Sequence, residues 1–464
     1  MLWLVSVLCA AAVAAAPRDD GGADRIIFDT PEAILANGYP VELHHPVTED
    51  GYILGVHRIP HGRDQAPAAD RPVVYLMHGL YSVDFQFVSM DPEFSMGYNM
   101  ADAGFDVWMG NARGNRYSRN HTTLDPDGEA DHMRFFDFSW EEVGMYDIPA
   151  AIDYILNYTG KDKLHYIGHS QGGTVFLVMG AMRPEYNAKL ETVHLLAGVG
   201  YQEYFPNTIL RAVATFSDII YNIALSQGLI EMYPARILEV IIGIIVGGGS
   251  TTRDDLCFGD PKHSALCQLI GTKYFMPPYI MRDDINATNI GDVMDMFAGL
   301  GGGSLKQVAH YGQNIRDKIF RRFHYDSEQN LELYGTRLPP AYDLSLITSR
   351  VIMHYTVNDV LLDERDVYAM AADLPNAQVR RVAREDFGHE EFVTAEDARE
   401  LVTDYIIDYI ARAHNGELDE ADEDEDAAVT DAPISTTTPD SATDLTFNVF
   451  LKLYVLLCAI YYVI

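Results

Sequence analysis

The residues best suited to chemistry in this chain are 168–172, GHSQG, a G-x-S-x-G pattern centred on Ser170. An apolar run, 164–167, precedes it, and a helical pattern of small and apolar residues, 172–182, follows it. A strand, a tight turn and a helix in this order predict a nucleophile elbow, in which the serine hydroxyl stands at the end of the strand. We therefore predict that Ser170 attacks a carbonyl carbon. The alternative is a glycine-rich turn with an ordinary capping serine.

A serine nucleophile needs a base and a carboxylate that orients that base. After a nucleophile elbow, the acid and then the histidine follow along the chain, each past a strand. Asp359 comes just after the apolar run 350–355, and His389 lies in a loop beyond the run 377–382. The sequence therefore predicts Ser170 as nucleophile, Asp359 as acid and His389 as base.

Two aspartates compete with Asp359 for the role of acid. Asp363 and Asp366 lie close to it, but they fall in the turn and helix that follow the strand. The sequence has sixteen histidines, and His389 is the best placed of them. Three others near the predicted site are expected to have structural roles: His78, His169 and His310.

The tetrahedral intermediate of acyl transfer carries an oxyanion, which needs two preorganised hydrogen-bond donors. The backbone N–H of Gln171, the residue after the nucleophile, is the first expected donor. The backbone N–H of Leu80, just past the turn at His78 and Gly79, is the second. Because both donors are backbone groups, the side-chain identities at these two positions do not test their assignment as oxyanion donors.

Strands and helical patterns alternate along most of the chain. The run 73–77 is continuously apolar, and 105–109 is apolar except for Asp106, as in strands buried on both faces. Residues 147–158 have an amphipathic helical pattern. This alternation predicts a mostly parallel sheet with helices on both faces. From about residue 200 to 342 the chain is helical and apolar instead, which predicts an inserted cap. Its apolar faces are expected to line an acyl-binding cleft, or else to form the core of a helical subdomain.

Composition narrows the class of protein. The chain has 464 residues, a hydrophobic content of 48% and a formal net charge of −35, so a nucleic-acid partner is not expected. Eight of the ten residues 417–426 are acidic. Such a block repels itself, so it is expected to be a solvated spacer and not a metal site. No metal or organic cofactor is expected, and the sequence does not predict the oligomeric state.

Both ends of the chain carry features of targeting segments. Residues 1–16 are apolar and end in three alanines, as in a secretory signal peptide, with a membrane anchor as the alternative. Residues 414–445 are acidic and Ser/Thr-rich, which predicts a stalk. The apolar residues 446–464 resemble a GPI attachment signal, with a single-pass anchor or a plain tail as alternatives. We expect a protein that is secreted or tethered to the outer cell surface, or alternatively a lysosomal one.

Two cysteines remain outside the apolar ends, Cys257 and Cys267. An oxidising compartment favours a disulfide between them over two buried free thiols. Three sequons are compatible with N-glycosylation, at Asn120, Asn157 and Asn286.

Several longer motifs resemble the acid lipase family, which comprises the gastric and lysosomal acid lipases and their insect relatives. The likeness runs from about residue 28 to 413. It is carried by 48–54 (TEDGYIL), 106–115 (DVWMGNARGN), 140–150 (WEEVGMYDIPA), 310–313 (HYGQ) and 339–342 (PPAY). The resemblance implies an α/β-hydrolase fold over residues 25–413, with an inserted helical cap. It implies the same roles for the residues named above: Ser170, Asp359 and His389 as the triad, Leu80 and Gln171 as the oxyanion donors, and Cys257 with Cys267 as a cap disulfide.

Two positions depart from the family pattern. Glu391 stands where the family has an aspartate before Phe392, and the family's tryptophan shortly after Leu80 is missing from residues 81–85. These departures bear on acyl-chain preference and optimum pH. The expected function is a serine ester hydrolase acting on triacylglycerols or steryl esters at a lipid-droplet or membrane surface. The alternatives are a carboxylesterase for smaller esters and a non-catalytic lipid-binding relative.

Overall fold

The computed structural model describes residues 29–232 and 301–418. Several predicted features lie outside the described residues: the signal peptide at 1–16, Cys257 and Cys267, the sequon at Asn286, and most of the stalk with the whole apolar tail.

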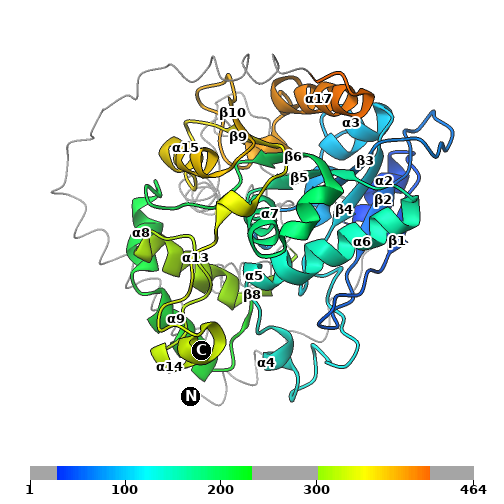
Figure 1. Ribbon diagram of the computed structural model, residues 1–464. Coiled ribbons are helices and arrows are strands. Elements are labelled where there is room, and N and C mark those ends of the chain that lie inside the picture. Colours follow the sequence, from blue (N-terminus) through cyan, green and yellow to red (C-terminus); the bar gives the residue numbers. More distant parts are fainter. Residues whose placement is uncertain (1–28, 233–300, 419–464) are drawn as a thin grey trace, which may run out of the picture.

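A mixed eight-stranded sheet forms the centre of the fold (Figure 1). Its strands lie in the order β1 (Glu42–His44), β2 (Val56–Ile59), β4 (Asp106–Gly110), β3 (Val73–Met77), β5 (Leu164–His169), β6 (Leu190–Leu196), β9 (Val351–Tyr355) and β10 (Ala377–Arg381). β1, β2 and β4 pair antiparallel at one edge, and the strands from β4 to β10 are parallel to one another. The prediction of a mostly parallel sheet is confirmed.

The central strands are buried along their whole length. Every residue of β3, β4 and β5 is buried. Burial on both faces explains why β3 is continuously apolar and why β4 and β5 are mostly apolar. The edge strand β1 and its neighbour β2 are short, at three and four residues, and each keeps some exposure. The sequence patterns did not predict these two strands, since so few residues show no clear periodicity.

Helices surround the sheet (Figure 1). Those before the cap are α2 (Thr30–Ala36), the short η1 (Asp84–Phe87), α3 (Met96–Asp102), α4 (His132–Phe135), α5 (Trp140–Glu142), the π-helical turn η2 (Val143–Asp147), α6 (Ile148–Thr159), α7 (Gln171–Met182) and η3 (Pro184–Lys189). Those after the cap are η6 (Leu344–Leu346), α15 (Glu364–Asp373), α16 (Glu391–Thr394), η7 (Arg399–Thr403) and α17 (Asp404–Asn415). The predicted helix at 147–158 is α6, shifted by one residue.

The helices lie on both faces of the sheet. The ring of Tyr166 on β5 lies 5.5 Å from the ring of Phe176 on α7. The next residue of β5, Ile167, is in register with His194 on β6, whose ring lies 5.3 Å from the ring of Tyr409 on α17. Because successive residues of a strand point to opposite faces, α7 and α17 cover opposite faces, as predicted.

Between β6 and β9 the described chain is mainly helical. Its elements are α8 (Thr208–Ala214), α9 (Ser217–Ser226), β7 (Glu231–Met232), β8 (Gly303–Ser304), α13 (Leu305–Asp317) and α14 (Ser327–Tyr334). β7 and β8 pair antiparallel, although the chain between them spans residues 233–302. In Figure 1 these helices lie together to one side of the sheet. We refer to this part of the chain as the cap.

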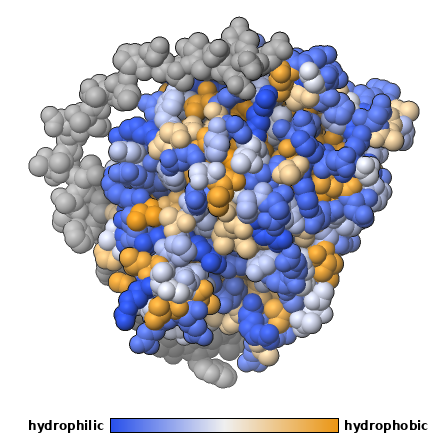
Figure 2. All heavy atoms as spheres, viewed as in Figure 1, coloured by the Kyte–Doolittle hydropathy of each residue, from blue (hydrophilic) through white to orange (hydrophobic). Residues whose placement is uncertain are grey.

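The cap carries exposed apolar side chains. Figure 2 shows orange residues gathered at the lower left, where Figure 1 places α8, α9 and α14. The exposed large apolar residues on or beside α8 and α9 are Leu210, Phe216, Ile219 and Ile223. No single helix in the described part of the chain is long and apolar enough to cross a membrane. α8 and α9 pass that test only as a pair bent by 60°.

Three of the long sequence motifs meet at one buried arginine. Arg113 is almost fully buried, and its guanidinium pairs with Asp50 at 2.6 Å and with Asp147 at 2.7 Å. Its backbone N–H also donates to Asp147 at 2.9 Å. A buried charge is tolerated only when it is paired and hydrogen-bonded, so these motifs join the loops after β1 and β4 to the start of α6.

Two further motifs join the sheet domain to the cap. Trp140 on α5 stacks on His310 of α13, with ring centroids 3.7 Å apart. Beside it, Glu141 accepts hydrogen bonds from Tyr342 and, at 2.7 Å, from Arg322. His310 makes hydrogen bonds with the Arg321 carbonyl and the Ser139 hydroxyl, so the structural role predicted for it fits these contacts.

Candidate active site

Ser170 occupies a sharp turn between β5 and α7. Its backbone has φ 52° and ψ −113°, a conformation that non-glycine residues adopt only when the surroundings impose it. The turn is tight because glycines flank it. A Cβ at Gly168 would lie 2.5 Å from the backbone of Gly172, and a Cβ at Gly172 would lie 2.2 Å from the carbonyl oxygen of Met77. The predicted elbow is therefore present, and it places the serine at the carboxyl end of β5.

The structure brings the three residues predicted as the triad together. Nε2 of His389 lies 2.8 Å from Oγ of Ser170, and its Nδ1 lies 2.7 Å from Oδ2 of Asp359. All three are buried, with Ser170 the most exposed at 9%. When Nδ1 donates to the carboxylate, Nε2 carries the lone pair and can accept the serine proton. The arrangement can thus move a proton from the hydroxyl to the imidazole.

Asp359 is held in place from its own loop. Its second oxygen, Oδ1, accepts hydrogen bonds from the backbone N–H groups of Leu361 at 2.7 Å and Leu362 at 3.0 Å. The two competing aspartates have other partners. Asp363 caps the N-terminus of α15, and Asp366 accepts from the backbone of the segment after β6. Of the three, the structure places Asp359 beside His389.

The electrostatic surroundings of His389 favour its protonated form. Burial alone would lower the pKa of this imidazole, but the charge and hydrogen bond of Asp359, with a smaller contribution from Glu390, raise its pKa to about 8. An imidazolium that forms during a reaction is therefore stabilised.

The two predicted oxyanion donors have no acceptor among the described residues, since neither the N–H of Leu80 nor that of Gln171 donates to another of them. The peptide unit between Gly79 and Leu80 is fixed by His78, whose Nδ1 donates to the Gly79 carbonyl at 2.7 Å. Because the peptide is trans, holding the carbonyl fixes the opposite direction of the Leu80 N–H. Nε2 of His78 accepts from the N–H of Ala112 at 3.0 Å, and burial lowers the pKa of His78 to about 4, so the imidazole stays neutral.

A hydrogen-bonded chain connects the loops of the site. The N–H of Gly79 donates to Oε1 of Gln86 at 3.3 Å, and Nε2 of Gln86 donates to Nδ1 of His169 at 3.3 Å. Nε2 of His169 then donates to the carbonyl of His389 at 3.0 Å. Sequence analysis missed Gln86, which lies in an ordinary-looking stretch of η1, and nothing in the local pattern distinguishes it.

Glu391 supports the loop that carries His389. It is fully buried, it accepts a hydrogen bond from the backbone N–H of Gly388, and it forms an ion pair with Arg384. The carboxylate that departs from the family pattern therefore anchors the loop two residues after His389.

Two further predicted site residues in the described part of the chain lie on the surface. Asn120 and Asn157 are both exposed, as a glycosylated asparagine must be.

Residues 29–232 and 301–418 contain no group of three or more histidine, cysteine, aspartate or glutamate side chains placed to hold a metal ion.

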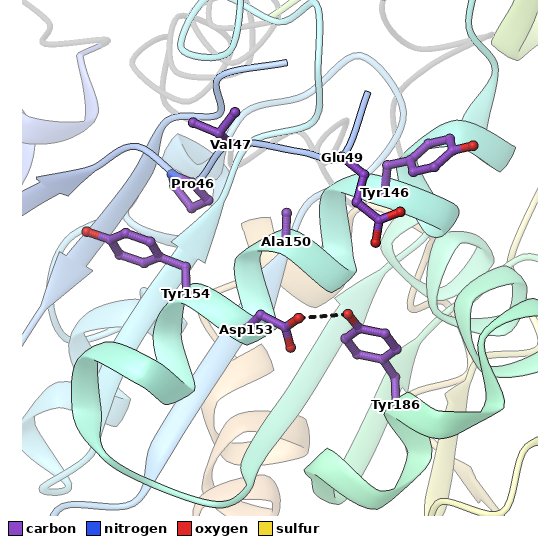
Figure 3. Close-up of a pocket in the computed structure, with 8 residues that line it drawn as sticks. All are labelled: Pro46, Val47, Glu49, Tyr146, Ala150, Asp153, Tyr154 and Tyr186. Carbon is purple, nitrogen blue, oxygen red and sulfur yellow. Dashed lines mark hydrogen bonds between the residues drawn. The ribbon is translucent and has the colours of Figure 1, made fainter. Parts of the chain in front are cut away.

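None of the three triad residues lines a groove on the outer surface. Figure 3 shows its lining, in which Tyr186 donates a hydrogen bond to Asp153 at 2.8 Å. The lining residues are Pro46, Val47, Glu49, Tyr146, Ala150, Asp153, Tyr154 and Tyr186. Its carboxylates are already paired, Glu49 with Arg183 at 3.0 Å and Asp153 with Lys189. We therefore do not place the substrate there.

Comparisons with known proteins agree with this fold. Residues 30–91 match the model of a partial alpha/beta-hydrolase lipase region, and residues 72–216 match that of the alpha/beta hydrolase fold. The chain is 37% identical to Lipase 1 of Drosophila melanogaster over 390 residues, covering 84% of this chain and 81% of that protein. The chain belongs to the acid lipase family. Members of this family of α/β hydrolases are ester hydrolases, and so is this chain.

Other members of the acid lipase family are similar over the same span. Lipase 3 of Drosophila melanogaster is 36% identical, with 82% of this chain and 93% of that protein covered. The gastric triacylglycerol lipase of Rattus norvegicus is 31% identical, with 81% and 89% covered. The resemblance inferred from the sequence motifs is confirmed.

Proposed function

We propose that this acid lipase hydrolyses neutral lipid esters through an acyl-enzyme intermediate on Ser170. His389 takes the proton of Oγ as the oxygen attacks the ester carbonyl, and then gives that proton to the departing alcohol. Water, deprotonated by the same imidazole, attacks the acyl-enzyme, and the imidazolium returns that proton to Oγ of Ser170 as the bond to the acyl group breaks and the fatty acid is released. Asp359 holds the tautomer that these steps need. The observation that carries the proposal is the single imidazole within hydrogen-bond distance of both Ser170 and Asp359.

The N–H groups of Leu80 and Gln171 are the proposed donors to the oxyanion of both tetrahedral intermediates. Both lie at the carboxyl ends of parallel strands, Leu80 after β3 and Gln171 after β5, where ligands bind in open α/β sheets. Such donors contribute about 10²–10³-fold each to kcat in serine hydrolases.

Triacylglycerols or steryl esters are the proposed substrates. The rat relative is named as a gastric triacylglycerol lipase, and the exposed apolar side chains of α8 and α9 are suited to contact with a lipid surface. A carboxylesterase for smaller soluble esters is the second candidate.

The test uses the purified chain and its Ser170→Ala variant on trioleoylglycerol, a steryl ester and a short-chain ester. We expect the wild type to hydrolyse a long-chain ester and the variant to lose that activity while its far-UV circular dichroism is unchanged. Equal turnover by both proteins contradicts the proposal. Hydrolysis of the short-chain ester alone moves the substrate to the carboxylesterase class.

We also propose a secretory route for the protein. The apolar residues 1–16, the pair Cys257 and Cys267, and the sequons at Asn120, Asn157 and Asn286 support it. Tethering through 446–464 by a GPI anchor is the associated proposal. Release of cell-surface protein by a phosphatidylinositol-specific phospholipase is expected, whereas retention after that treatment favours a peptide span.

A further inference from the structure

The loop after β3, which carries the proposed oxyanion donor Leu80, is attached to the cap through the next residue, Tyr81. The carbonyl of Tyr81 accepts from the N–H of Gly301 at 2.7 Å, and its hydroxyl donates to the carbonyl of Ser304 at 3.0 Å. The ring packs so closely on the cap that a Cβ at Gly303 would lie 3.1 Å from it. Tyr81 has φ 56°, which is unfavourable for a bulky residue. Contacts with the cap are therefore positioned to hold this conformation.

The second donor is attached to the same segment of the cap through its side chain. Nε2 of Gln307 on α13 donates to Oε1 of Gln171 at 3.0 Å, and both side chains are buried. Oε1 of Gln307 accepts from the N–H of Ser304, which closes a capping box at the start of α13. One turn further along α13, the hydroxyl of Tyr311 lies 2.7 Å from Oγ1 of Thr174 on α7.

We propose that Tyr81 and Gln307 are positioning residues through which residues 301–311 of the cap fix the two oxyanion donors relative to each other. The donors come from loops after two different strands, and the segment 301–311 is bonded to both loops. Since an oxyanion hole works only when both donors point to the same place before the reaction, loosening either link misaligns one donor. This inference rests on the proposed function, because it assumes an oxyanion bound by Leu80 and Gln171.

The rival explanation is that these contacts only dock the cap on the sheet domain. In that case their loss lowers stability, or raises KM through a disturbed cleft, without a specific effect on the tetrahedral intermediate. The two explanations differ in the affinity for an alkyl trifluoromethyl ketone, whose adduct with Ser170 carries an oxyanion in the same place as the intermediate.

The experiment compares two test variants with two matched controls. Tyr81→Phe removes one hydroxyl that donates to a cap carbonyl, and Tyr334→Phe does the same inside the cap, where the hydroxyl donates to the Phe323 carbonyl at 2.9 Å. Gln307→Leu removes the link to Gln171. Its control is Gln313→Leu, an equally buried glutamine on α13 whose bonds stay within the cap. For each variant the measurements are kcat and KM on a soluble ester, the inhibition constant of the ketone, and the melting temperature.

We expect Tyr81→Phe and Gln307→Leu each to lower kcat by about tenfold, less than the loss of a whole donor. The inhibition constant of the ketone should rise by the same factor, while KM stays within about twofold. The two control variants should lower only the melting temperature. Kinetics of the test variants that match those of their controls overturn the inference, and so does a fall in kcat without weaker binding of the ketone.

A double-variant cycle checks the link to Gln171 directly. Gln171→Leu keeps the backbone donor but removes the side chain that Gln307 holds, so Gln171→Leu/Gln307→Leu should lose no more kcat than either single variant. Fully multiplicative losses contradict the link. If Gln307→Leu does not fold, Tyr81→Phe still tests the proposal. A wild type that neither hydrolyses esters nor binds the ketone would instead refute the proposed function.

Discussion

Nε2 of His389 lies 2.8 Å from Oγ of Ser170, although the two residues are 219 positions apart in the chain. The parallel sheet explains this proximity, because the carboxyl ends of β5, β9 and β10 all open at the same edge. Ser170 follows β5, Asp359 follows β9, and His389 follows β10.

The role of Asp359 can be separated from that of the nearby Asp363. Asp359→Asn should lower kcat by about 10³–10⁴-fold with folding intact, because the amide favours the wrong imidazole tautomer. Asp363→Asn changes only a helix cap and an exposed pair with Arg365, so its kcat should remain within about twofold of the wild type. Steady-state kinetics on a soluble ester decide the matter. A larger loss in the Asp363 variant would reassign the acid.

The dependence of activity on pH should report the ionisation of His389. The base must be neutral to take the serine proton, and its pKa is raised to about 8, so kcat/KM should increase as the pH rises through that region. Glu390 contributes to the raised pKa. Glu390→Gln should therefore move the acid limb to lower pH, whereas Glu385→Gln, at an exposed pair with Arg381, should leave it in place. Identical limbs in the wild type and the Glu390 variant would contradict this electrostatic account.

The strained backbone at Ser170 predicts an unusual effect on stability. At φ 52° a Cβ is unfavourable, so Ser170→Gly should be more stable than Ser170→Ala by about 1 kcal/mol in the free energy of unfolding. Ser349 is buried and has no positive φ, so there the alanine variant should be the more stable of the two. Urea unfolding of the four variants measures both differences. If the alanine variant is the more stable of the pair at both sites, the elbow stores no strain.

Buried histidines should make the fold sensitive to acid. On the α17 face of the sheet, Nδ1 of His194 lies 3.1 Å from Nε2 of His354. Burial lowers the pKa of His194 to about 3 and the pKa of His354 well below its usual value. The unfolded chain takes up these protons as the pH falls through about 6.5 and the folded chain does not, so stability is lost below that pH.

In His194→Gln, the unfolded chain should take up one proton fewer than the unfolded wild type as the pH falls. The stability that the protein loses between pH 7 and pH 5 should become smaller by about 2 kcal/mol in the variant. Urea unfolding at the two pH values measures this difference. An unchanged dependence on pH would mean that His194 is already protonated in the folded protein or does not remain buried.

Local patterns predicted the parts of the molecule that depend on local physics. The apolar run of β3, the mostly apolar sequence of β4 and the amphipathic pattern of α6 each fit the burial of the element. The glycines around Ser170 indicated the elbow because the close approach of Gly172 to Met77 excludes a side chain. Chain order then predicted which later acid and histidine would lie beside it.

Local sequence patterns could not predict contacts between segments that are distant in the chain. Gln86 and Gln307 look like ordinary polar residues of a short helix and a helix start, and only the folded chain shows that they hold His169 and Gln171. The sequence did not predict the positive φ of Tyr81, because a bulky residue adopts that conformation only when contacts from other parts of the fold impose it.

The central claim is that Ser170 is a nucleophile activated by His389. Its most direct test is treatment of the purified protein with a fluorophosphonate, followed by peptide mapping of the adduct by mass spectrometry. We predict one adduct per chain on Ser170 in the wild type and labelling slower by at least about 10³-fold in His389→Ala. Labelling on another residue, or an equal rate in the His389 variant, would contradict the account.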